Sequence, residues 1–494
     1  MSGLRRRDFL KAAGAAAGAV ALGGAQAFEA GAVPLVRSAR SRLPRGSLLD
    51  VAPADSPIDT VVVVMMENRS FDHYLGWLAN DDRYVERGRS RYGSKFRVDG
   101  RTDLVYPDAH GRRQRTHHLT RIATDPHPYR GCGHPVPGHG WTAGRIELAE
   151  GFLAPGTGND DYAIGWFDGE DVPVHAKLAE RFTVCDRSFA SLCSGTIPNR
   201  QYFYSAQSGG ERDDPGALHP GMYTTTTIWD RLEAAGVDYG GFYTDLPMML
   251  LWGEQHRQHL ANLDTYFSRA AEGTLPSVSW VEPAFVGDLR TDDHTDGDIR
   301  LGQAFVREVF DAFASSPQWE HGLFVLTYDE WGGFFEHVRP PILPDDRATR
   351  DLDTTFGLAG FRVPTILASP YARPGYVDHT VFDHTSFLRF LEWRFLGAPA
   401  RGPGRDSDTW YLTARDRHAN NLGEALAATD PDVGSAEDVR SVSVRYDPGC
   451  ATTPVQAGEQ GLGLGARDPF RAREDLAELL AAKYPEPSHR PWIT

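Results

Sequence analysis

Two uninterrupted apolar runs in this chain each end in a pair of polar side chains. The pairs are Glu67 with Asn68, after the run 61–66, and Asp329 with Glu330, after the run 323–328. Continuous apolar runs of this length are typical of strands buried on both faces, as in a parallel sheet covered by helices. Ligands of open α/β sheets bind outside the carboxyl ends of the strands. We therefore expect both pairs at one edge of a central sheet.

Along the rest of the chain, segments with helical periodicity alternate with segments typical of strands. Helices are predicted at 141–152, 227–235, 302–314 and 382–395, with a last one at 468–483, and further strands at 239–243, 278–281 and 363–368. This alternation indicates an α/β fold, with a mostly parallel central sheet flanked by helices. The stretch 81–138 is crowded with Arg, His, Gly and Pro, so we expect an irregular excursion over the sheet.

The first residues have the features of an export signal. Arg5 to Lys11 is basic around Asp8 and Phe9, and an Ala/Gly-rich stretch and an Ala-x-Ala site follow. The paired arginines indicate twin-arginine export. We expect a signal peptide at 1–27, a leader at 28–57, one catalytic domain at 58–400 and an extension at 401–494 packed on that domain. No later apolar run is long enough to span a bilayer, which predicts a soluble protein in the periplasm, at the cell wall or outside the cell.

The bulk composition limits the partners. The 494 residues have a formal net charge of -16 and 41% hydrophobic content, enough for a large core. An acidic chain is a poor match for the phosphate backbone of a nucleic acid, and we expect at most transient contact with a membrane surface. The four cysteines are Cys132, Cys185, Cys193 and Cys450. They lack C-x-x-C spacing, so we expect no cysteine-bound zinc, and both disulfides and packed free thiols stay open.

The two polar pairs together suit a metal ion. Three carboxylates at one place repel each other unless a cation neutralises them, and oxygen ligands favour a hard divalent ion. Calcium, magnesium, manganese and zinc all fit such a set. The plain alternative is that each pair only solvates the end of its strand.

A candidate nucleophile lies between the two pairs. In the segment 193–200, Pro198 suits the first turn of a helix and places Thr196 just before the helix N-terminus, where free N–H groups attract phosphate oxygens. A hydroxyl bound to a divalent metal can attack phosphorus. The alternative is an ordinary helix cap by Thr196 or Ser194.

From about Asp59 to Arg394 the chain resembles the bacterial phospholipase C and acid phosphatase family, within the alkaline phosphatase-like superfamily. The shared motifs are Met66-Glu67-Asn68-Arg69-Ser70-Phe71-Asp72-His73, Phe182-Thr183-Val184-Cys185-Asp186, Thr196-Ile197-Pro198-Asn199-Arg200, the stretch from Tyr328 to Pro340, and Asp383-His384-Thr385-Ser386. The resemblance implies a divalent metal ion held by Glu67, Asn68, Asp329 and Glu330, with Thr196 as both ligand and nucleophile. Thr196 also fills the position that sulfatases oxidise to an aldehyde, which threonine cannot become.

Histidines complete the expected site. A phosphoryl-transfer site needs groups that neutralise phosphate oxygens and a proton donor for the leaving alkoxide. The resemblance implies that the phosphate pocket is lined by His139, Asp293, His294 and His337. His73 and His384 are expected to support the site from outside it. Relatives commonly have Asn-Gly-x-Met-Asp-Gly-Phe where this chain has Ile146 to Phe152, so substrate choice transfers less well than the chemistry.

The sequence thus predicts a secreted, metal-dependent phosphoesterase. In-line attack by Thr196 would form a phosphothreonine, with His337 or His294 protonating the leaving alcohol. The substrate is expected to be a phospholipid cut in the manner of a phospholipase C, or a small phosphomonoester as for an acid phosphatase. The rival from another class is a catalytically silent metal- or lipid-binding protein, which a missing Thr196 or acidic pair would have favoured.

Overall fold

The computed structural model describes residues 46–121, 127–287, 289–347, 356–403, 409–446 and Arg473. Four of the features expected from the sequence lie wholly or mostly outside these residues. They are the signal peptide at 1–27, most of the leader at 28–57, the helix at 468–483 apart from Arg473, and Cys450.

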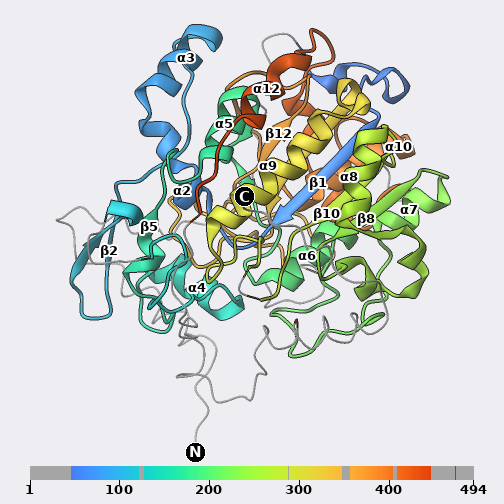
Figure 1. Ribbon diagram of the computed structural model, residues 1–494. Helices are drawn as coiled ribbons and strands as arrows, with labels where there is room; N and C mark the ends of the chain where they lie inside the picture. Colours follow the sequence, from blue (N-terminus) through green and yellow to red (C-terminus); the bar gives the residue numbers. More distant parts are fainter. Residues whose placement is uncertain are drawn as a thin grey trace, which may run out of the picture.

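An eight-stranded sheet forms the centre of the molecule, in the order β13-β6-β12-β11-β1-β10-β8-β9 (Figure 1). Its strands are β1 (Thr60–Met66), β6 (Thr183–Cys185), β8 (Tyr239–Tyr243), β9 (Leu260–Asn262), β10 (Val278–Glu282), β11 (Gly322–Tyr328), β12 (Ile366–Ala368) and β13 (Tyr376–Asp378). Strand β12 is antiparallel to both its neighbours, and the other pairs are parallel. The prediction of a mostly parallel central sheet is therefore confirmed.

Helices cover both faces of this sheet. Val62 of β1 pairs with Phe324 of β11 and the next residue, Val63, pairs with Trp280 of β10, so Phe324 and Trp280 point to opposite faces. The ring of Phe324 packs on Phe310 of α9 (Ile299–Ala314), whereas Trp280 packs on Phe387 of α10 (His384–Leu396). Strands β1 and β11 are buried along their whole length, which explains their continuous apolar runs.

The remaining helices are α2 (Phe71–Tyr74), α3 (Asp82–Tyr92), α4 (Trp141–Glu150), α5 (Pro173–Arg181), α6 (Thr196–Ser205), α7 (Ile228–Ala234), α8 (Leu263–Glu272), α11 (Ala414–His418) and α12 (Glu437–Arg440). Of these, α4, α6 and α7 lie close to predicted positions, and the others were not predicted. Helix α9 begins at Ile299, earlier than predicted, because Asp298 caps it. Helix α10 begins at His384 rather than 382, because Asp383 is its N-cap.

The predicted excursion at 81–138 contributes no strand to the central sheet in its described part. Short two-stranded ladders lie outside that sheet: β2 (Val105–Pro107) with β3 (Arg113–Arg115), β4 (His117–His118) with β5 (Gly165–Trp166), and β7 (Ser188–Phe189) with β14 (Phe382–Asp383). These ladders are irregular additions to the α/β core, as predicted.

The ends of the described chain pack on the core. Leu48 is fully buried and its N–H donates to the carbonyl of Leu426 at 2.7 Å. Arg415 forms buried ion pairs with Asp345 at 3.1 Å and Asp383 at 3.2 Å. Residues before β1 and after α10 therefore belong to the same folded unit as the sheet.

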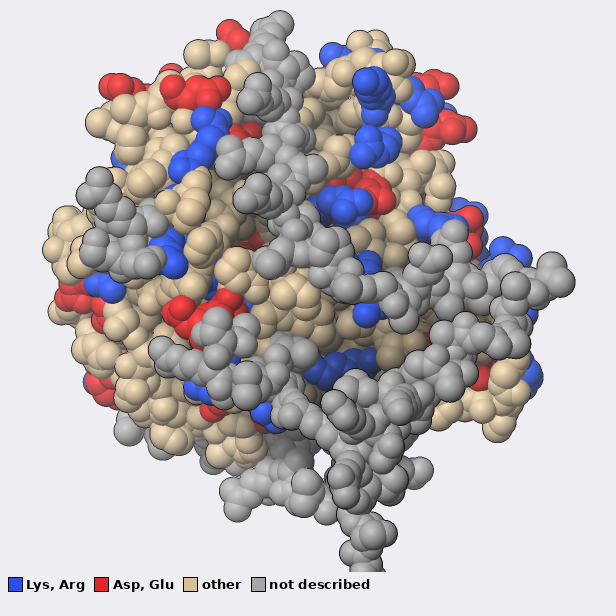
Figure 2. All heavy atoms as spheres, turned by 180° about the vertical axis from the view of Figure 1, so that it is seen from behind, with Lys and Arg blue, Asp and Glu red and all other residues tan. Residues whose placement is uncertain are grey.

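The cysteines and the surface follow ordinary rules for a globular protein. Cys132 forms a disulfide, whereas Cys185 and Cys193 are buried free thiols. Acidic and basic side chains are interspersed over the face seen in Figure 2. Among the described helices, none is both long and apolar enough to cross a bilayer.

Candidate active site

The two predicted polar pairs meet at the edge of the sheet. Met66 and Tyr328 are register partners at the ends of β1 and β11, so the residues that follow them emerge side by side. The backbone N–H of Asn68 donates to Asp329 Oδ1 at 3.4 Å, and the N–H of Asp329 donates to the Met66 carbonyl at 3.1 Å. All four side chains of the pairs are fully buried. The structure therefore brings Glu67, Asn68, Asp329 and Glu330 together, as expected.

Asn68 connects these pairs to the candidate nucleophile. Its φ of 59° lies in the left-handed region, which asparagine tolerates better than most residues. Its Nδ2 donates to Thr196 Oγ1 at 3.3 Å and to the carboxylate of Glu330. One amide group thus spans the hydroxyl and an acidic side chain that are 134 residues apart in the sequence (330 minus 196).

Thr196 is the first residue of α6, and Gly195 is the N-cap. The Gly195 position has no side-chain cap, so the alternative of an ordinary cap by Thr196 or Ser194 does not describe this helix. Asn199 holds the preceding turn instead: its Oδ1 accepts the N–H of Leu192 at 2.8 Å and its Nδ2 donates to the Ser194 carbonyl at 2.8 Å. These bonds fix the turn that presents Thr196.

Two arginines lie within this acidic group. Arg200, one turn after Thr196, donates from Nε to Asp329 Oδ2 at 3.2 Å and from Nη2 to Glu67 Oε1 at 3.3 Å. Arg473 donates from Nη1 to Glu67 Oε2 at 2.6 Å. Sequence reasoning missed both contacts. Arg200 stood inside a recognised motif and could have been found, whereas no pattern near Arg473 indicates its position.

Burial controls the protonation of the carboxylates. It raises the pKa of Asp329 to about 7 although Arg200 opposes the shift, and it raises the pKa of Glu330 well above its usual value. Burial also acts to raise the pKa of Glu67, but Arg473 and Arg200 outweigh it and hold that pKa below its usual value. The group therefore carries more negative charge than its low-dielectric surroundings stabilise, and further positive charge would favour it.

His139 and His294 lie next to this group. Their ring centroids are 6.0 Å apart, and His139 Nε2 is 3.8 Å from Glu330 Oε1. The other nitrogen of His139 contacts the Pro137 carbonyl at 2.7 Å, and His294 Nδ1 contacts Asp296 Oδ1 at 2.6 Å. Burial lowers the pKa of both rings. Both histidines thus occupy the expected neighbourhood, each oriented through one nitrogen.

Asp293 lies among tyrosines. Its φ of 70° is in the left-handed region, and its Oδ2 accepts hydrogen bonds from Tyr74 at 2.9 Å and Tyr328 at 2.6 Å. Burial raises the pKa of Asp293 to about 7. The neighbouring Asp292 is the residue that meets the acidic group: its carbonyl accepts the N–H of Glu67 at 2.6 Å, and its buried Oδ2 has no partner among the described residues.

His337 belongs to a different cluster. Its Nδ1 lies 2.6 Å from Asp72 Oδ2 and its Nε2 lies 3.2 Å from Asp99 Oδ1. Burial works against the charged ring, but these carboxylates raise the pKa of His337 to about 9. Asp72, Glu336 and His337 could geometrically hold a metal, yet the Arg362 guanidinium already bonds Glu336 at 2.6 Å. In the described part of the chain, no hydrogen bond or ion pair joins His337 to Thr196.

His73 and His384 have structural partners. His73 stacks on Phe334 at 3.7 Å between ring centroids, and its Nδ1 contacts the Gly165 carbonyl at 2.7 Å. His384 Nε2 contacts the Tyr328 carbonyl at 3.0 Å. Both lie beside the strands and loops that carry the site, as their expected supporting role requires.

The buried side chain of Glu147 connects two of the loops that carry site residues. Glu147 of α4 accepts hydrogen bonds from Trp331 Nε1 at 2.8 Å and from Asn159 Nδ2 at 3.0 Å. Trp331 directly follows Glu330, and Asn159 accepts the N–H of Gly138, the residue before His139, at 2.7 Å. Burial raises the pKa of Glu147 well above its usual value. Helix α4 therefore supports the site through this side chain.

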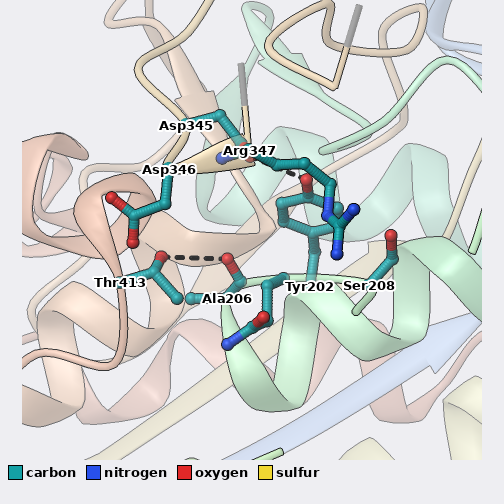
Figure 3. A pocket seen from close by; sticks show the side chains of 8 residues that line it. Tyr202, Ala206, Ser208, Asp345, Asp346, Arg347 and Thr413 are labelled. Carbon is teal, nitrogen blue, oxygen red and sulfur yellow. Dashed lines mark hydrogen bonds between the residues drawn. The ribbon is translucent and has the colours of Figure 1, made fainter. Parts of the chain in front are cut away.

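A small cavity lies beside the C-terminal part of α6. A cavity of about 40 Å³ is lined by Tyr202, Asp345, Asp346, Arg347 and Thr413, among others (Figure 3). Within it, Tyr202 donates to Asp345 at 2.7 Å and Thr413 donates to the Ala206 carbonyl at 3.0 Å. It contains none of the predicted site residues.

Comparison with known proteins identifies the family to which the chain belongs. Residues 58–396 match the Phosphoesterase family. The non-specific phospholipase C6 of Arabidopsis thaliana is 35% identical over 408 residues, which cover 77% of this chain and 72% of that protein. Phospholipase C B of Mycobacterium tuberculosis (strain ATCC 25618 / H37Rv) is 28% identical over 468 residues, which cover 84% of this chain and 86% of that protein.

Solved structures are more distant. An alkaline phosphatase superfamily protein from Vibrio parahaemolyticus has a TM-score of 0.29 at 10% identity, and covers 55% of this chain and 70% of its own. The lipoteichoic acid synthase LtaP from Listeria monocytogenes has a TM-score of 0.37 at 8% identity, and covers 89% of this chain and 96% of its own. From the family match and the phospholipase C relatives, the chain belongs to the Phosphoesterase family and is a hydrolase acting on phosphoric ester bonds.

Proposed function

We propose that this protein is an exported, metal-dependent phospholipase C that releases a phosphorylated headgroup through a phosphothreonine intermediate. The observation that carries the proposal is the amide of Asn68, which contacts both Thr196 Oγ1 and the Glu330 carboxylate. It places a helix-terminal hydroxyl directly beside an acidic group. The relatives from a plant and a bacterium are phospholipases C, which supports a phospholipid substrate.

The residues present fit a divalent cation. Glu67, Asn68, Asp329 and Glu330 would hold it, with Thr196 Oγ1 as a further oxygen. Two buried acceptor atoms, Asn68 Oδ1 and Asp292 Oδ2, have no hydrogen-bond partner among the described residues, and burial disfavours the charge on Asp329 and Glu330. When bound, the ion would supply positive charge that lowers the pKa of the Thr196 hydroxyl and neutralises a phosphate oxygen.

The residues then divide the reaction between them. The Thr196 hydroxyl gives its proton to water and its Oγ attacks phosphorus in line, so a new O–P bond forms while the P–O bond to the diacylglycerol breaks. The leaving alkoxide takes a proton from a histidine. His294 is better placed for this than His337, because it neighbours His139 near Glu330, whereas both nitrogens of His337 contact carboxylates elsewhere. Water then hydrolyses the phosphothreonine and regenerates the hydroxyl.

The central experiment compares Thr196→Ala and Thr196→Ser with the unchanged protein on phosphatidylcholine vesicles. Phosphocholine release should be lost in Thr196→Ala and partly kept in Thr196→Ser, with all three proteins equally folded by circular dichroism. Rapid acid quench and peptide mass analysis should find a phosphoryl group on Thr196. Near-normal release by Thr196→Ala would rule out the covalent route.

Two further measurements separate the remaining parts of the proposal. Dialysis against a chelator should abolish release, and re-addition of Mg²⁺, Mn²⁺, Ca²⁺ or Zn²⁺ singly should identify the ion that restores it. A soluble phosphomonoester assayed under the same conditions tests acid phosphatase action, and exclusive monoester hydrolysis would remove the lipase assignment. Export by the twin-arginine route predicts that the mature protein is secreted and cleaved after residue 27. Changing Arg5, Arg6 and Arg7 to Lys should abolish this secretion.

A further inference from the structure

The carboxylate of Asp214 lies against the turn that presents Thr196. Its Oδ1 accepts the backbone N–H of Ile197, the second residue of α6, at 2.7 Å. A Cβ added to Gly195 would lie 3.2 to 3.3 Å from the carboxylate atoms of Asp214, so the group covers this turn as well. Asp213, the preceding residue, is exposed and instead accepts the N–H of Trp141 at 2.7 Å, at the start of α4.

The position of Asp214 changes what the helix terminus offers to a substrate. Free N–H groups at a helix N-terminus attract phosphate oxygens. Here one of those groups, next to the nucleophile, is already bound to a negatively charged oxygen. Asp214 is only partly exposed, so its charge is weakly screened by water.

The surrounding charges do not remove this effect. Burial raises the pKa of Asp214 and Arg473 opposes that shift, but the same guanidinium is hydrogen-bonded to Glu67. Glu67 and Asp213 add negative charge to the surroundings of Asp214. The negative charge beside Thr196 therefore disfavours a phosphoryl group with two negative charges more than a phosphoryl group with one.

We propose that Asp214 is a specificity-determining residue that selects phosphodiester monoanions over phosphomonoester dianions. This inference rests on the proposed function, because it assumes attack by Thr196. In both esters the Thr196 Oγ–P bond forms, the P–O bond to the leaving alcohol breaks, and the alkoxide is protonated. The substrates differ in one oxygen, which carries an alkyl group in the diester and a second negative charge in the monoester.

Two small esters with the same leaving group isolate that difference. Methyl para-nitrophenyl phosphate is a monoanion, and para-nitrophenyl phosphate is largely a dianion above the second pKa of a phosphate ester, about 6. The test compares kcat/KM for both esters at pH 8 in the unchanged protein, Asp214→Asn and Asp213→Asn. Asparagine keeps an acceptor for the Ile197 N–H, and Asp213→Asn makes the same chemical change at the neighbouring, exposed residue.

Asp214→Asn should raise monoester relative to diester kcat/KM by on the order of tenfold, because one unit charge near phosphorus is removed. Inhibition by inorganic phosphate, a readout independent of the leaving group, should strengthen in parallel. Asp213→Asn should shift the ratio much less, because water screens the charge of this exposed residue. An unchanged ratio in Asp214→Asn, or an equal shift in Asp213→Asn, would overturn the assignment of selectivity to Asp214.

The Thr196→Ala variant distinguishes failure of this inference from failure of the proposed function. If both ester activities need Thr196 but the ratio ignores Asp214, only the inference falls. If both activities survive in Thr196→Ala, the proposed mechanism falls and the inference with it. Should Asp214→Asn unfold, Asp214→Ser, which keeps a hydroxyl acceptor, must give the same ratio shift.

Discussion

Arg473 and Glu67 form a buried ion pair at the centre of the candidate active site, although 406 positions separate them in the sequence. The guanidinium of Arg473 donates to Glu67 Oε2 at 2.6 Å, while Arg200 donates to Oε1 at 3.3 Å. Both oxygens of a proposed metal ligand therefore already contact positive charge. Any cation that binds Glu67 must share this carboxylate with two arginines.

This sharing predicts that Arg473 and a metal ion stabilise the same charges. In the presence of a chelator, Arg473→Gln should lower the free energy of unfolding by about 3–5 kcal/mol, the usual cost of breaking a buried pair. Saturating divalent metal should reduce this difference in unfolding free energy, because the ion replaces the positive charge that Arg473 supplied to Glu67. Thermal unfolding with and without metal measures both effects. Arg473→Lys, which keeps a charge, is the matched control, and equal midpoints for all three proteins in chelator would contradict the prediction.

His337 predicts a pH-dependent stability. Its pKa is raised to about 9 because Asp72 and Asp99 outweigh the effect of burial, compared with about 6.5 in an unfolded chain. Protonated His337 therefore stabilises the fold fully below pH about 6.5, and this contribution, up to about 3 kcal/mol, disappears as the pH rises through about 9. Urea unfolding of the unchanged protein and His337→Asn at pH 6, 8 and 10 should show a difference that shrinks with pH. A constant difference would show that the ring charge is not involved.

The same variant separates a structural from a catalytic role of this histidine. Because His294 neighbours Glu67 and His139, whereas both nitrogens of His337 contact Asp72 and Asp99, headgroup release by folded His337→Asn should fall much less than release by His294→Asn. A loss of rate in His337→Asn as large as that in His294→Asn, at full stability, would make His337 the proton donor instead.

Glu147 is expected to support the site through its hydrogen bonds. Glu147→Ala leaves Trp331 Nε1 and Asn159 Nδ2 without this acceptor and should cost about 2–5 kcal/mol in stability and weaken metal binding. Glu147→Gln keeps one acceptor oxygen and should cost less. Glu150→Ala, an exposed change on the same helix, should stay within about 0.5 kcal/mol. Chemical denaturation and calorimetric metal titration test this order. A larger loss of stability in Glu147→Gln than in Glu147→Ala would refute it.

Asn199 should affect turnover without touching the substrate. Asn199→Ala removes its bonds to the backbone at Leu192, Ser194 and Gly195, so Thr196 loses its fixed turn. We expect a cost of about 2–3 kcal/mol in stability and a larger fall in kcat than rise in KM. Asn199→Asp keeps only the acceptor for the Leu192 N–H, so its stability and kcat should lie between those of Asn199→Ala and the unchanged protein. A variant with normal kcat would show that the turn holds its shape without this side chain.

Much of the fold was readable because its signal is local. The apolar runs at β1 and β11 identify fully buried strands, and their abrupt ends locate Glu67, Asn68, Asp329 and Glu330 at one edge. Helix boundaries differed by a few residues where a cap such as Asp298 or Asp383 decided the start. Pro198 likewise indicated a helix that starts just after Thr196, and in the structure Thr196 is its first residue.

The sequence alone therefore located the longest buried strands, several of the helices and the polar groups at the strand ends. Tertiary packing then selected which neighbouring groups share the site. The positive φ of Asp293 turns the chain so that Asp292 meets Glu67 while Asp293 meets Tyr74 and Tyr328. Asp72 and Asp99 hold His337 in a separate cluster, and Arg473 arrives from the far end of the chain. Such choices depend on long-range packing and buried charge pairing, which leave no periodic trace in the sequence.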